Sequence, residues 1–503
     1  MTGDELRAAV ANEGNIRERG FEVLATLAER IAMARDDESP EMSEGREIAI
    51  RMLDYREGLG TQTQVLDAIL RRVGLFPYLD SERLGARDLV AVQAHRPLEM
   101  PEDDVVFHRL QADVYRRLMD GESVVLSAPT SFGKSLVIDA LIASGKYRNV
   151  AIVVPTIALI DETRRRLSRF SPTYKVITHV SQPLAERNLL VLTQERVLDI
   201  EKLPDIDLFV IDEFYKLSPD REGDADRAYL LNQAFQRLHR TGAQFYFLGP
   251  NIRALKEGIP NDFLGRLQFI RTGVSTVAID EIHIKGGDDP HQTLAERCRG
   301  FDDPTLIYVQ SPRSARDVLK ALIEGGVSAP NSSLDRAVEW LAETYHPAWS
   351  VCEGMAHGIG VHHGQLPRSV AHFMVRAFRE RRLRFLICTS SLIEGVNTSA
   401  KNVIVFDKKI GNANFDFLIL ATSGGDLDEC LCTTLAACTF STTSQTSNCL
   451  TLTFQRSVSP MTPLPACYLV WNAMSSPIDR EGAWTPSSKN RPCPKMCCAP
   501  TLV

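Results

Sequence analysis

Long apolar runs, a leader-like start and an excess of positive charge are all missing from this 503-residue sequence. No apolar stretch approaches the ~18 residues that a membrane-spanning helix needs, so we expect no membrane partner. Residues 1–5 lack the basic and apolar regions of a secretory signal, which favours a soluble, cytoplasmic protein. The formal net charge of −7 gives nucleic acid no general attraction. Any such binding must therefore use local basic groups and backbone donors.

Cysteine is nearly absent from the first 429 residues, which contain only Cys298, Cys352 and Cys388. This usage is typical of a reducing compartment. The other eight of the eleven cysteines lie between Cys430 and Cys498. In the same region charged residues become sparse and periodicity is lost, which sets the C-terminal part of the chain apart from the rest.

The periodicity divides the chain into four segments. Residues 1–100 carry apolar side chains at helical spacing and predict a helical accessory domain. Residues 101–285 and 296–416 alternate short apolar runs with helical stretches, which is typical of parallel sheets with helices on both faces. A hinge is expected at residues 286–290, and residues 417–503 are expected to form an irregular, disordered tail. The expected strands are residues 124–126, 151–154, 189–192, 208–211, 245–248, 305–309, 358–361, 385–388 and 403–406.

The clearest chemical signal follows the apolar run 124–126. The next residues are typical of a phosphate-binding loop and the start of a helix, and Gly133 allows the tight turn between them. Backbone N–H groups of such a turn point at phosphate oxygens, Lys134 adds a positive charge, and the Ser135 hydroxyl suits Mg²⁺. The first glycine of the strict pattern is replaced by alanine. The residues predicted to hold the nucleotide are Ala128, Pro129, Thr130, Ser131, Phe132, Gly133, Lys134 and Ser135.

A second apolar run, residues 208–211, ends in the carboxylates Asp212 and Glu213. Parallel strands place their carboxyl ends at one edge of a sheet, where α/β proteins bind ligands. One carboxylate there can hold Mg²⁺ and the other can orient the attacking water. The sequence therefore predicts a site that hydrolyses a nucleoside triphosphate. Its predicted catalytic residues are Lys134, Asp212 and Glu213, and its magnesium ligands are Ser135 and Asp212.

In this order the motifs resemble those of superfamily-2 DExH/DEAD-box helicases, particularly the Ski2-like group, over roughly residues 105–410. The resemblance implies two RecA-like domains, the second one incomplete, with ATP and Mg²⁺ between them and single-stranded or duplex nucleic acid as the partner. Phe107 and Gln111 stand where the family has its adenine-reading element, since an amide can form two hydrogen bonds with adenine. Residues 128–135 and 155–162 also resemble the Hachiman-type antiphage defence helicases.

Three residues of the first domain are expected from this resemblance to contact nucleic acid: Pro155, Thr156 and Thr193. In the family, short hydroxyls and helix N-termini at these places bind the phosphate backbone of one strand. The same residues are equally typical of a strand end and of helix caps. The two interpretations therefore stay open at this point.

The second domain adds residues 389–397, which closely match the family's motif V. The resemblance implies that Thr389 contacts nucleic acid and that three further residues line the ATP cleft: Glu394, Gly395 and Asn397. The adjacent His362 and His363 are not accompanied by a third ligand at suitable spacing, so a zinc site is disfavoured. The arginine-rich runs at residues 164–166 and 379–384 are interpreted as solvated helix faces in preference to nucleic-acid contacts.

Departures from the family pattern concern the coupling of hydrolysis. Tyr215 replaces the usual His or Asp, and residues 248–251 lack the hydroxyls of motif III. Motif VI, whose arginines reach the γ-phosphate in the family with an effect of about 10³–10⁵ in rate, is not found after residue 417. Residues 421–430 can be encoded so that a shifted frame gives Asn-Ile-Gly-Gly-Arg-Ser-Gly-Arg-Met, which resembles motif VI. We therefore interpret the tail as the product of a single-base slip near residues 412–421, with a cysteine-rich metal module as the alternative.

The most economical hypothesis is an ATP-dependent nucleic-acid helicase or translocase. Two alternatives remain open. Without motif VI, the chain is a module that binds ATP and nucleic acid but hydrolyses poorly. In the other alternative, the chain is the motor subunit of an antiphage system. A separate subunit would then supply the nuclease, because no nuclease constellation is visible in the sequence.

Overall fold

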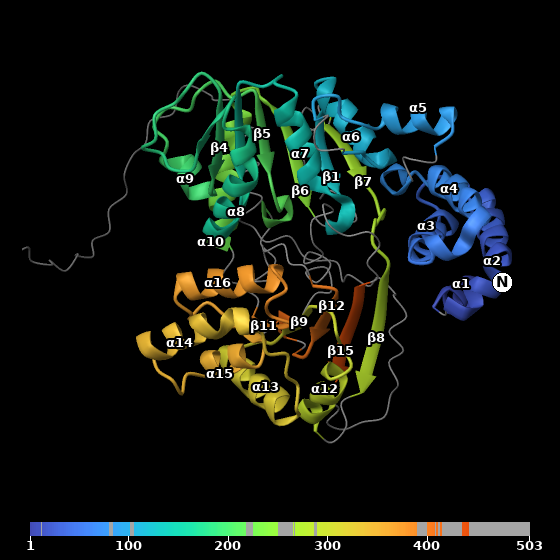
Figure 1. Ribbon diagram of the computed structural model, residues 1–503. Coiled ribbons are helices and arrows are strands. Elements are labelled where there is room, and N and C mark those ends of the chain that lie inside the picture. Colours follow the sequence, from blue (N-terminus) through green and yellow to red (C-terminus); the bar gives the residue numbers. More distant parts are fainter. Residues whose placement is uncertain are drawn as a thin grey trace, which may run out of the picture. The chain divides into compact units, whose positions relative to one another are not determined.

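The computed structural model describes residues 1–11, 13–79, 84–100, 105–217, 225–249, 265, 267–285, 289–389, 400–407, 409–410, 413–414 and 435–441 (Figure 1). In this part of the chain no helix combines the length and apolar character needed to cross a membrane.

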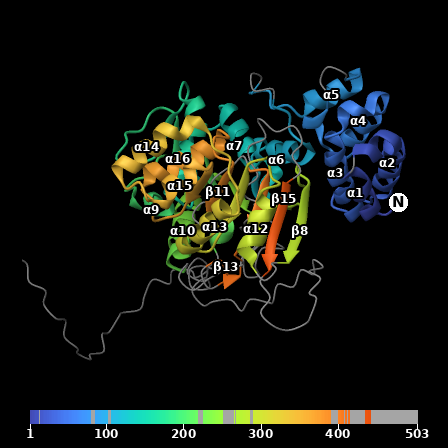
Figure 2. The ribbon, with the colours of Figure 1, turned by 60° about the horizontal axis from the view of Figure 1, so that its bottom comes forward.

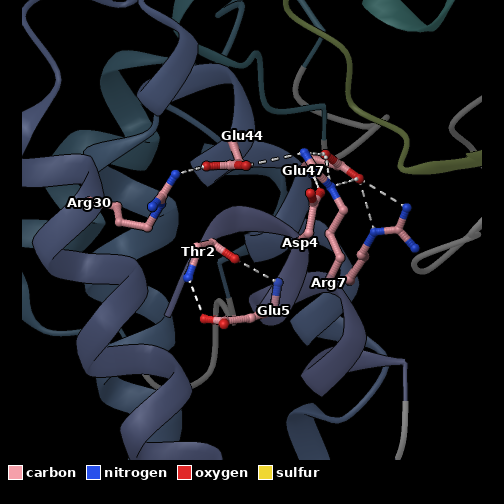
Figure 3. Close-up of polar contacts among 8 residues, drawn as sticks. Thr2, Asp4, Glu5, Arg7, Arg30, Glu44 and Glu47 are labelled. Atoms are coloured by element: carbon pink, nitrogen blue, oxygen red, sulfur yellow. Dashed lines mark hydrogen bonds and ion pairs between the residues drawn. The ribbon is translucent and has the colours of Figure 1, made fainter. Parts of the chain in front are cut away.

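The N-terminal segment is helical, as its periodicity predicts. Its helices begin at recognisable signals: Thr2 and Glu5 form a capping box at the first one, and Pro40 occupies the first turn of the third. Figure 3 shows the capping box beside ion pairs in which Arg7 and Arg30 contact the carboxylates of Glu47 and Glu44. The elements are α1 (Gly3–Val10), α2 (Glu13–Met33), α3 (Pro40–Leu53), α4 (Thr63–Arg72), α5 (Ala86–Ala94) and the 3₁₀ helices η1 (Arg56–Gln62) and η2 (Phe76–Tyr78).

A seven-stranded parallel sheet follows, in the order β3-β4-β2-β5-β6-β1-β7. Its strands are β1 (Ser123–Ser127), β2 (Asn149–Val153), β3 (Lys175–Ile177), β4 (Asn188–Leu192), β5 (Leu208–Ile211), β6 (Gln244–Gly249) and β7 (Leu267–Arg271). The helices are α6 (Arg109–Met119), α7 (Lys134–Ala143), α8 (Ile157–Leu167), α9 (Gln194–Asp199) and α10 (Ala225–His239), with the 3₁₀ helices η5 (Thr130–Phe132), η6 (Ser168–Phe170) and η7 (Phe214–Leu217).

Alternate residues of the central strands pack on opposite faces of this sheet. On one face, Val124 and Val210 belong to a core that also contains residues of α6, α7 and α8. On the other face, Phe209 and Phe247 lie against Phe235 of α10, with ring centroids 6.4 and 5.5 Å away. Helices therefore cover both faces, and this is why the runs at residues 124–126 and 208–211 are apolar throughout.

The second sheet has the order β10-β11-β9-β12-β15-β8, and its pairs are also parallel. Its strands are β8 (Ile279–Lys285), β9 (Thr305–Tyr308), β10 (Ile359–His362), β11 (Phe385–Cys388), β12 (Asn402–Val405) and β15 (Leu435–Ser441). The helices are α12 (Pro290–Cys298), α13 (Pro312–Glu324), α14 (Asp335–Thr344), α15 (Ser350–Ala356) and α16 (Arg368–Arg379), with the 3₁₀ helix η8 (Ser332–Leu334). A small antiparallel pair consists of β13 (Lys409–Ile410) and β14 (Ala413–Asn414).

The predicted fold class, α/β with two parallel-sheet domains after a helical N-terminus, is confirmed. All nine expected strands are present within a residue or two of the expected bounds, whereas β3, β7, β8 and β15 were not expected. Residues 435–441 form β15 between β12 and β8 (Figure 1), and Figure 2 shows β15 beside β8. An irregular tail was expected here; the other residues after 414 lie outside the described ranges. β8 pairs in the second sheet, although the predicted first domain extends to residue 285.

Candidate nucleotide site

The predicted phosphate-binding loop connects β1 to α7. Gly133 is the N-cap of α7 and has a left-handed backbone, with φ of +73° and ψ of 41°. A side chain would be strained in this conformation, so glycine is required for the turn. Lys134 begins the helix and Ser135 follows it. The turn thus carries the ammonium and the hydroxyl to the helix N-terminus, where backbone N–H groups favour anions.

The Lys134 ammonium lies among backbone carbonyls at the carboxyl edge of the first sheet. Its Nζ donates to the carbonyl oxygens of Ala128 at 2.9 Å, Gly249 at 3.2 Å and Pro129 at 3.4 Å. Burial lowers the pKa of Lys134, and the nearby carboxylates of Asp212 and Glu213 oppose this shift. An ammonium held by neutral carbonyls remains free to gain from an anionic ligand.

Asp212 and Glu213 follow the last residue of β5. The main-chain N–H of Asp212 donates to the carbonyl of Val153, and that of Glu213 donates to Asp212 Oδ1, both at 3.0 Å. Burial and the adjacent Glu213 carboxylate raise the pKa of Asp212, while Lys134 lowers it. A buried carboxylate with a second carboxylate beside it is a favourable environment for a divalent cation.

Glu213 has an unusual backbone for a residue other than glycine, with φ of +59°. Strain of this kind costs about 1–2 kcal/mol and is frequent where function requires a particular side-chain direction. The strands β1 and β5 are parallel and separated only by β6, so their carboxyl ends meet at the same edge. The structure therefore brings Lys134, Asp212 and Glu213 together, while their predicted roles stay predictions.

Gly249, at the end of β6, touches both parts of this arrangement. Its carbonyl accepts hydrogen bonds from Lys134 Nζ and from the main-chain N–H of Ala128, each at 3.2 Å. A Cβ on Gly249 would lie 2.6 Å from Cε1 of Phe214, which follows Glu213. The absence of a side chain at this position thus lets the ring after the two carboxylates approach the loop that holds Lys134.

The predicted adenine-reading pair lies at the start of α6. Phe107 is 1 % exposed and packs among Met100, Ala112 and Ala140. Gln111, also 1 % exposed, donates from Nε2 to the carbonyls of Phe132 at 2.8 Å and Gly133 at 3.3 Å. Its amide is therefore hydrogen-bonded to the phosphate-binding loop, and reading adenine would require an exchange of these bonds.

His108 is a neighbour of this pair that the sequence did not single out. Its Nε2–H donates to the carbonyl of Phe132 at 3.2 Å, and its Nδ1 accepts from the main-chain N–H of Gln111 at 3.4 Å. Burial lowers its pKa to about 3, so the ring is neutral at physiological pH. The available signal was a capping box between His108 and Gln111 with an unusual residue type as N-cap.

The arginine run at residues 164–166 has a structural role in part. Arg166 donates from Nη1 to the carbonyl of Ser135 at 3.0 Å and forms an ion pair with Asp139 of α7. Arg169 adds a second contact to Asp139 at 3.0 Å. These arginines hold α7, and with it Ser135, against α8.

Residues predicted to contact nucleic acid lie at strand ends and helix starts. Thr156 is the N-cap of α8, and its hydroxyl accepts from the main-chain N–H of Leu159 at 3.3 Å. Thr193 is the N-cap of α9 and is 6 % exposed. Pro155, between β2 and α8, is buried and accepts a hydrogen bond from Arg227 through its carbonyl. The capping interpretation thus describes Thr156, and the nucleic-acid role of all three stays a prediction.

In the second sheet Thr389 follows β11, is 7 % exposed, and donates its main-chain N–H to the carbonyl of His362 at 3.1 Å. Burial lowers the pKa of both His362 and His363. Glu394, Gly395 and Asn397, like the residues proposed to hide motif VI, lie outside the described residues. Thr130 is placed in η5, but its side chain is also outside them.

A further contact to the phosphate-binding loop comes from residues 272–278, which connect β7 to β8. Ser131 Oγ lies 3.0 Å from Ser275 Oγ, and Thr276 Oγ1 donates to the carbonyl of Ser131. These residues are more than 140 positions apart, and no spacing in the sequence indicates that they meet. The carbonyl of Pro129, in the same loop, accepts its hydrogen bond from Lys134 Nζ.

Comparison with known proteins gives two family matches. Residues 1–89 match the model of the anti-bacteriophage protein B N-terminal domain, and residues 108–247 match that of the DEAD/DEAH box helicases. Anti-bacteriophage protein B of Escherichia coli (strain K12) is 40% identical over 391 residues, which cover 74% of this chain and 52% of that protein.

Archaeal helicases are more distant relatives. The ATP-dependent DNA helicase Hel308 of Thermoplasma acidophilum is 24% identical over 340 residues, covering 61% of this chain and 47% of that protein. The Hel308 of Pyrobaculum calidifontis is 24% identical over 326 residues, covering 58% and 45%. The chain thus spans about half the length of these relatives. The predicted helicase resemblance is confirmed: this chain carries a DEAD/DEAH box helicase domain behind an N-terminal domain of the anti-bacteriophage protein B type.

Proposed function

We propose that this chain is an ATP-dependent nucleic-acid helicase or translocase, with ATP and Mg²⁺ bound at residues 128–135. The observation that carries the proposal is the meeting of Lys134 with Asp212 and Glu213 at one edge of the first sheet. A cation beside two carboxylates is the arrangement that a magnesium–triphosphate complex requires. The helicase domain at residues 108–247 supports the same reaction class.

The donor set suits magnesium. Within the described ranges no group of three or more His, Cys, Asp or Glu side chains could hold a metal. Magnesium is commonly bound by one or two protein oxygens, with water and phosphate completing its octahedron. Ser135 and Asp212 would supply those oxygens. Burial and the adjacent Glu213 carboxylate raise the pKa of Asp212, and a bound cation would oppose that shift.

In this proposal Lys134 neutralises charge on the phosphates, and Glu213 orients the attacking water and accepts its proton. The metal would supply further neutralisation of the charge that develops on the γ-phosphate. Phe107 and Gln111 would lie on the adenine side. The residues proposed for the second domain's face of the ATP cleft are Glu394, Gly395 and Asn397.

Nucleic acid would contact the chain through the hydroxyls and helix starts near Pro155, Thr156, Thr193 and Thr389. The support is the helicase family match together with the relatives named as DNA helicases. A protein with a net charge of −7 needs such local donors, since phosphate contacts from helix N-termini and short hydroxyls require no general positive field.

A lysine pair provides the test. Lys134→Ala should abolish ATP binding and nucleic-acid-stimulated ATP hydrolysis. Lys146→Ala is the matched control, because Lys146 Nζ also donates to backbone carbonyls, 2.7 Å from Met119 and 3.4 Å from Leu118, at the opposite end of α7. Wild-type turnover in the Lys134→Ala protein would refute the proposed site.

A hydrolysis-deficient module is the second candidate function, because the sequence after residue 417 lacks the arginines of motif VI. ATP hydrolysis by this chain should then be compared with that of a chain whose shifted frame is restored. If only the restored chain hydrolyses ATP, the present one is a binding module. A nucleotide sequence in which the shifted frame is not open would remove the frame-slip hypothesis.

We further propose a role in defence against phage, from the name of the anti-bacteriophage relative. The proposal of a separate nuclease subunit as partner rests on the sequence, in which no nuclease constellation is visible. Plaque counts on cells carrying the complete gene should fall relative to cells carrying its Lys134→Ala variant. Equal counts would count against this role. Co-purification of a nuclease with the wild-type chain would identify the partner.

A further inference from the structure

The backbone carbonyls of Ser131, Phe132 and Gly133 in the phosphate-binding loop all accept hydrogen bonds from side chains. Thr276 binds the first, His108 and Gln111 bind the second, and Gln111 also binds the third. Each of these partners belongs to a segment that contacts the N-terminal helices. Two contact routes therefore lead from the N-terminal helices to the phosphate-binding loop.

The first route runs through Arg109, the first residue of α6. Its Nη1 donates to both carboxylate oxygens of Asp37, at 3.1 and 3.0 Å. Its Nη2 donates to the carbonyls of Arg71 and Arg72, at 3.2 and 3.1 Å. The main-chain N–H of Arg109 also donates to Gly74, at 2.9 Å. The start of α6, which includes the neighbouring His108, is thereby fixed on the N-terminal helices.

Asp37 is itself held in place by the N-terminal segment. Arg46, only 4 % exposed, donates to the Asp37 carbonyl at 2.6 Å and to the carbonyl of Val73 at 3.2 Å. The Asp37 carboxylate thus presents a fixed anion to Arg109. Arg109 Nη1 approaches both oxygens of this carboxylate, and an ion pair that is partly buried and has a rigid partner contributes more than an ordinary surface pair.

The second route runs through residues 272–278. The Tyr78 hydroxyl donates to the Thr276 carbonyl at 2.9 Å, and the main-chain N–H of Gly273 donates to Glu38 at 3.4 Å. Ala278 is fully buried in the core of the N-terminal helices. Thr276, 3 % exposed, then donates its hydroxyl to the Ser131 carbonyl.

We propose that the N-terminal helical segment positions the phosphate-binding loop for nucleotide through these two routes, with Asp37, Arg109 and Thr276 as positioning residues. The inference rests on the proposed function, because it concerns the affinity of the same loop for nucleotide. Its physical basis is preorganisation: a loop whose carbonyls are fixed loses less conformational entropy when its N–H groups bind phosphate. Release of either route would weaken nucleotide binding without removing any group that touches the nucleotide.

Equilibrium binding of a fluorescent ADP analogue with Mg²⁺, to the full chain, tests the second route. Thr276→Val removes the hydroxyl at nearly constant volume and should weaken binding about five-fold, the effect of one lost hydrogen bond. Thr276→Ser keeps the hydroxyl and should restore most of the affinity. Thr241→Val is the control, since it removes a comparable hydroxyl bond to Leu238, 2.6 Å long, at the end of α10, and should leave binding unchanged.

A pair of carboxylates tests the first route without disturbing the core. Asp37→Asn removes the charge that holds Arg109, on a side chain that is 32 % exposed, and should weaken binding about three-fold to ten-fold. Glu47→Gln weakens arginine contacts within the same segment, to Arg7 at 2.9 Å (Figure 3) and to Arg51 at 3.0 Å, and should have no effect on binding. Hydrogen exchange at the amides of residues 131–133 should accelerate in Asp37→Asn and not in Glu47→Gln.

The outcomes separate this inference from the proposed function. If Asp37→Asn and Thr276→Val bind the nucleotide as tightly as the wild type, while Lys134→Ala does not bind, the positioning role is wrong and the nucleotide site stands. If the wild type itself does not bind the nucleotide, the proposed function fails first. A loss of affinity in Glu47→Gln equal to that in Asp37→Asn would also overturn the inference, because the effect would then reflect general destabilisation of the helices.

Discussion

Replacement of Gly249 by alanine is the most direct perturbation of the contact between the two halves of the candidate site. The added Cβ would lie 2.6 and 2.7 Å from Cε1 and Cδ1 of Phe214, closer than carbon atoms normally approach. The φ of Gly249 is not in the left-handed region, so the effect comes from crowding alone. Phe214 is 6 % exposed and stacks on Phe247, so the ring cannot simply turn into solvent.

Overpacking of this kind costs about 1–3 kcal/mol, and we expect Gly249→Ala to lower the free energy of unfolding by about 2 kcal/mol. Because the Gly249 carbonyl binds Lys134 and the ring follows Glu213, nucleotide affinity should fall as well. Urea denaturation measures the first effect, and titration with a nucleotide analogue measures the second.

A second substitution tests whether the loss of stability comes from crowding against the Phe214 ring. Phe214→Leu removes the ring edge, so the double variant with Gly249→Ala should regain at least about 1 kcal/mol relative to the sum of the single variants. Gly58→Ala is the control, since a Cβ there meets nothing within 4 Å. A Gly249→Ala protein as stable as the wild type, or strictly additive effects in the double variant, would refute the steric argument.

Three further predictions concern single residues. Glu213→Asn should stabilise the fold by about 0.5–1 kcal/mol, since asparagine tolerates a φ of +59° better, while abolishing hydrolysis; a lower denaturation midpoint would contradict this. The unfolded chain protonates His108 near its ordinary pKa of 6.5, but the folded chain only near a pKa of about 3. The free energy of unfolding should therefore fall by about 1.4 kcal/mol per pH unit from this group as pH decreases through that window, and the slope should shrink in His108→Asn; equal slopes would exclude this origin. Arg166→Met should cost about 2 kcal/mol, because Asp139, with a side chain 6 % exposed, loses a partner, and nucleic-acid affinity measured by fluorescence anisotropy should not change; a selective loss of that affinity would favour the contact interpretation of residues 164–166.

In the first sheet the five inner strands were predictable from the sequence, whereas the edge strands β3 and β7 were not. The runs at residues 124–126 and 208–211 are apolar throughout because helices cover both faces there. β7 (Leu267–Arg271) has only one buried residue, Leu267, and its exposed Gln268 and Arg271 leave no run of more than two apolar residues. β3 has only three residues. A run of apolar residues in the sequence indicates a strand that is long and buried. These two edge strands are too short or too exposed to produce such a run.

The candidate site was predictable where its residues follow the carboxyl end of a strand, Asp212 directly after β5 and Lys134 at the end of the loop after β1. Parallel topology brings such residues to one edge, so their distance along the chain does not matter. The contacts of Ser131 with Ser275 and Thr276 could not be anticipated in this way. They depend on where a connecting segment runs over the surface, and hydroxyl groups carry no periodic signal.

The connection from β7 to β8 links three parts of the molecule within residues 272–278. It leaves the first sheet, contacts the helices at Tyr78 and the loop at Ser131, and enters the second sheet at Ile279. Within seven residues the same segment is therefore bound to both the N-terminal helices and the phosphate-binding loop. An insertion of a few flexible Gly-Ser residues there would leave the strands of both sheets intact but would change the spacing at which these two contacts are made.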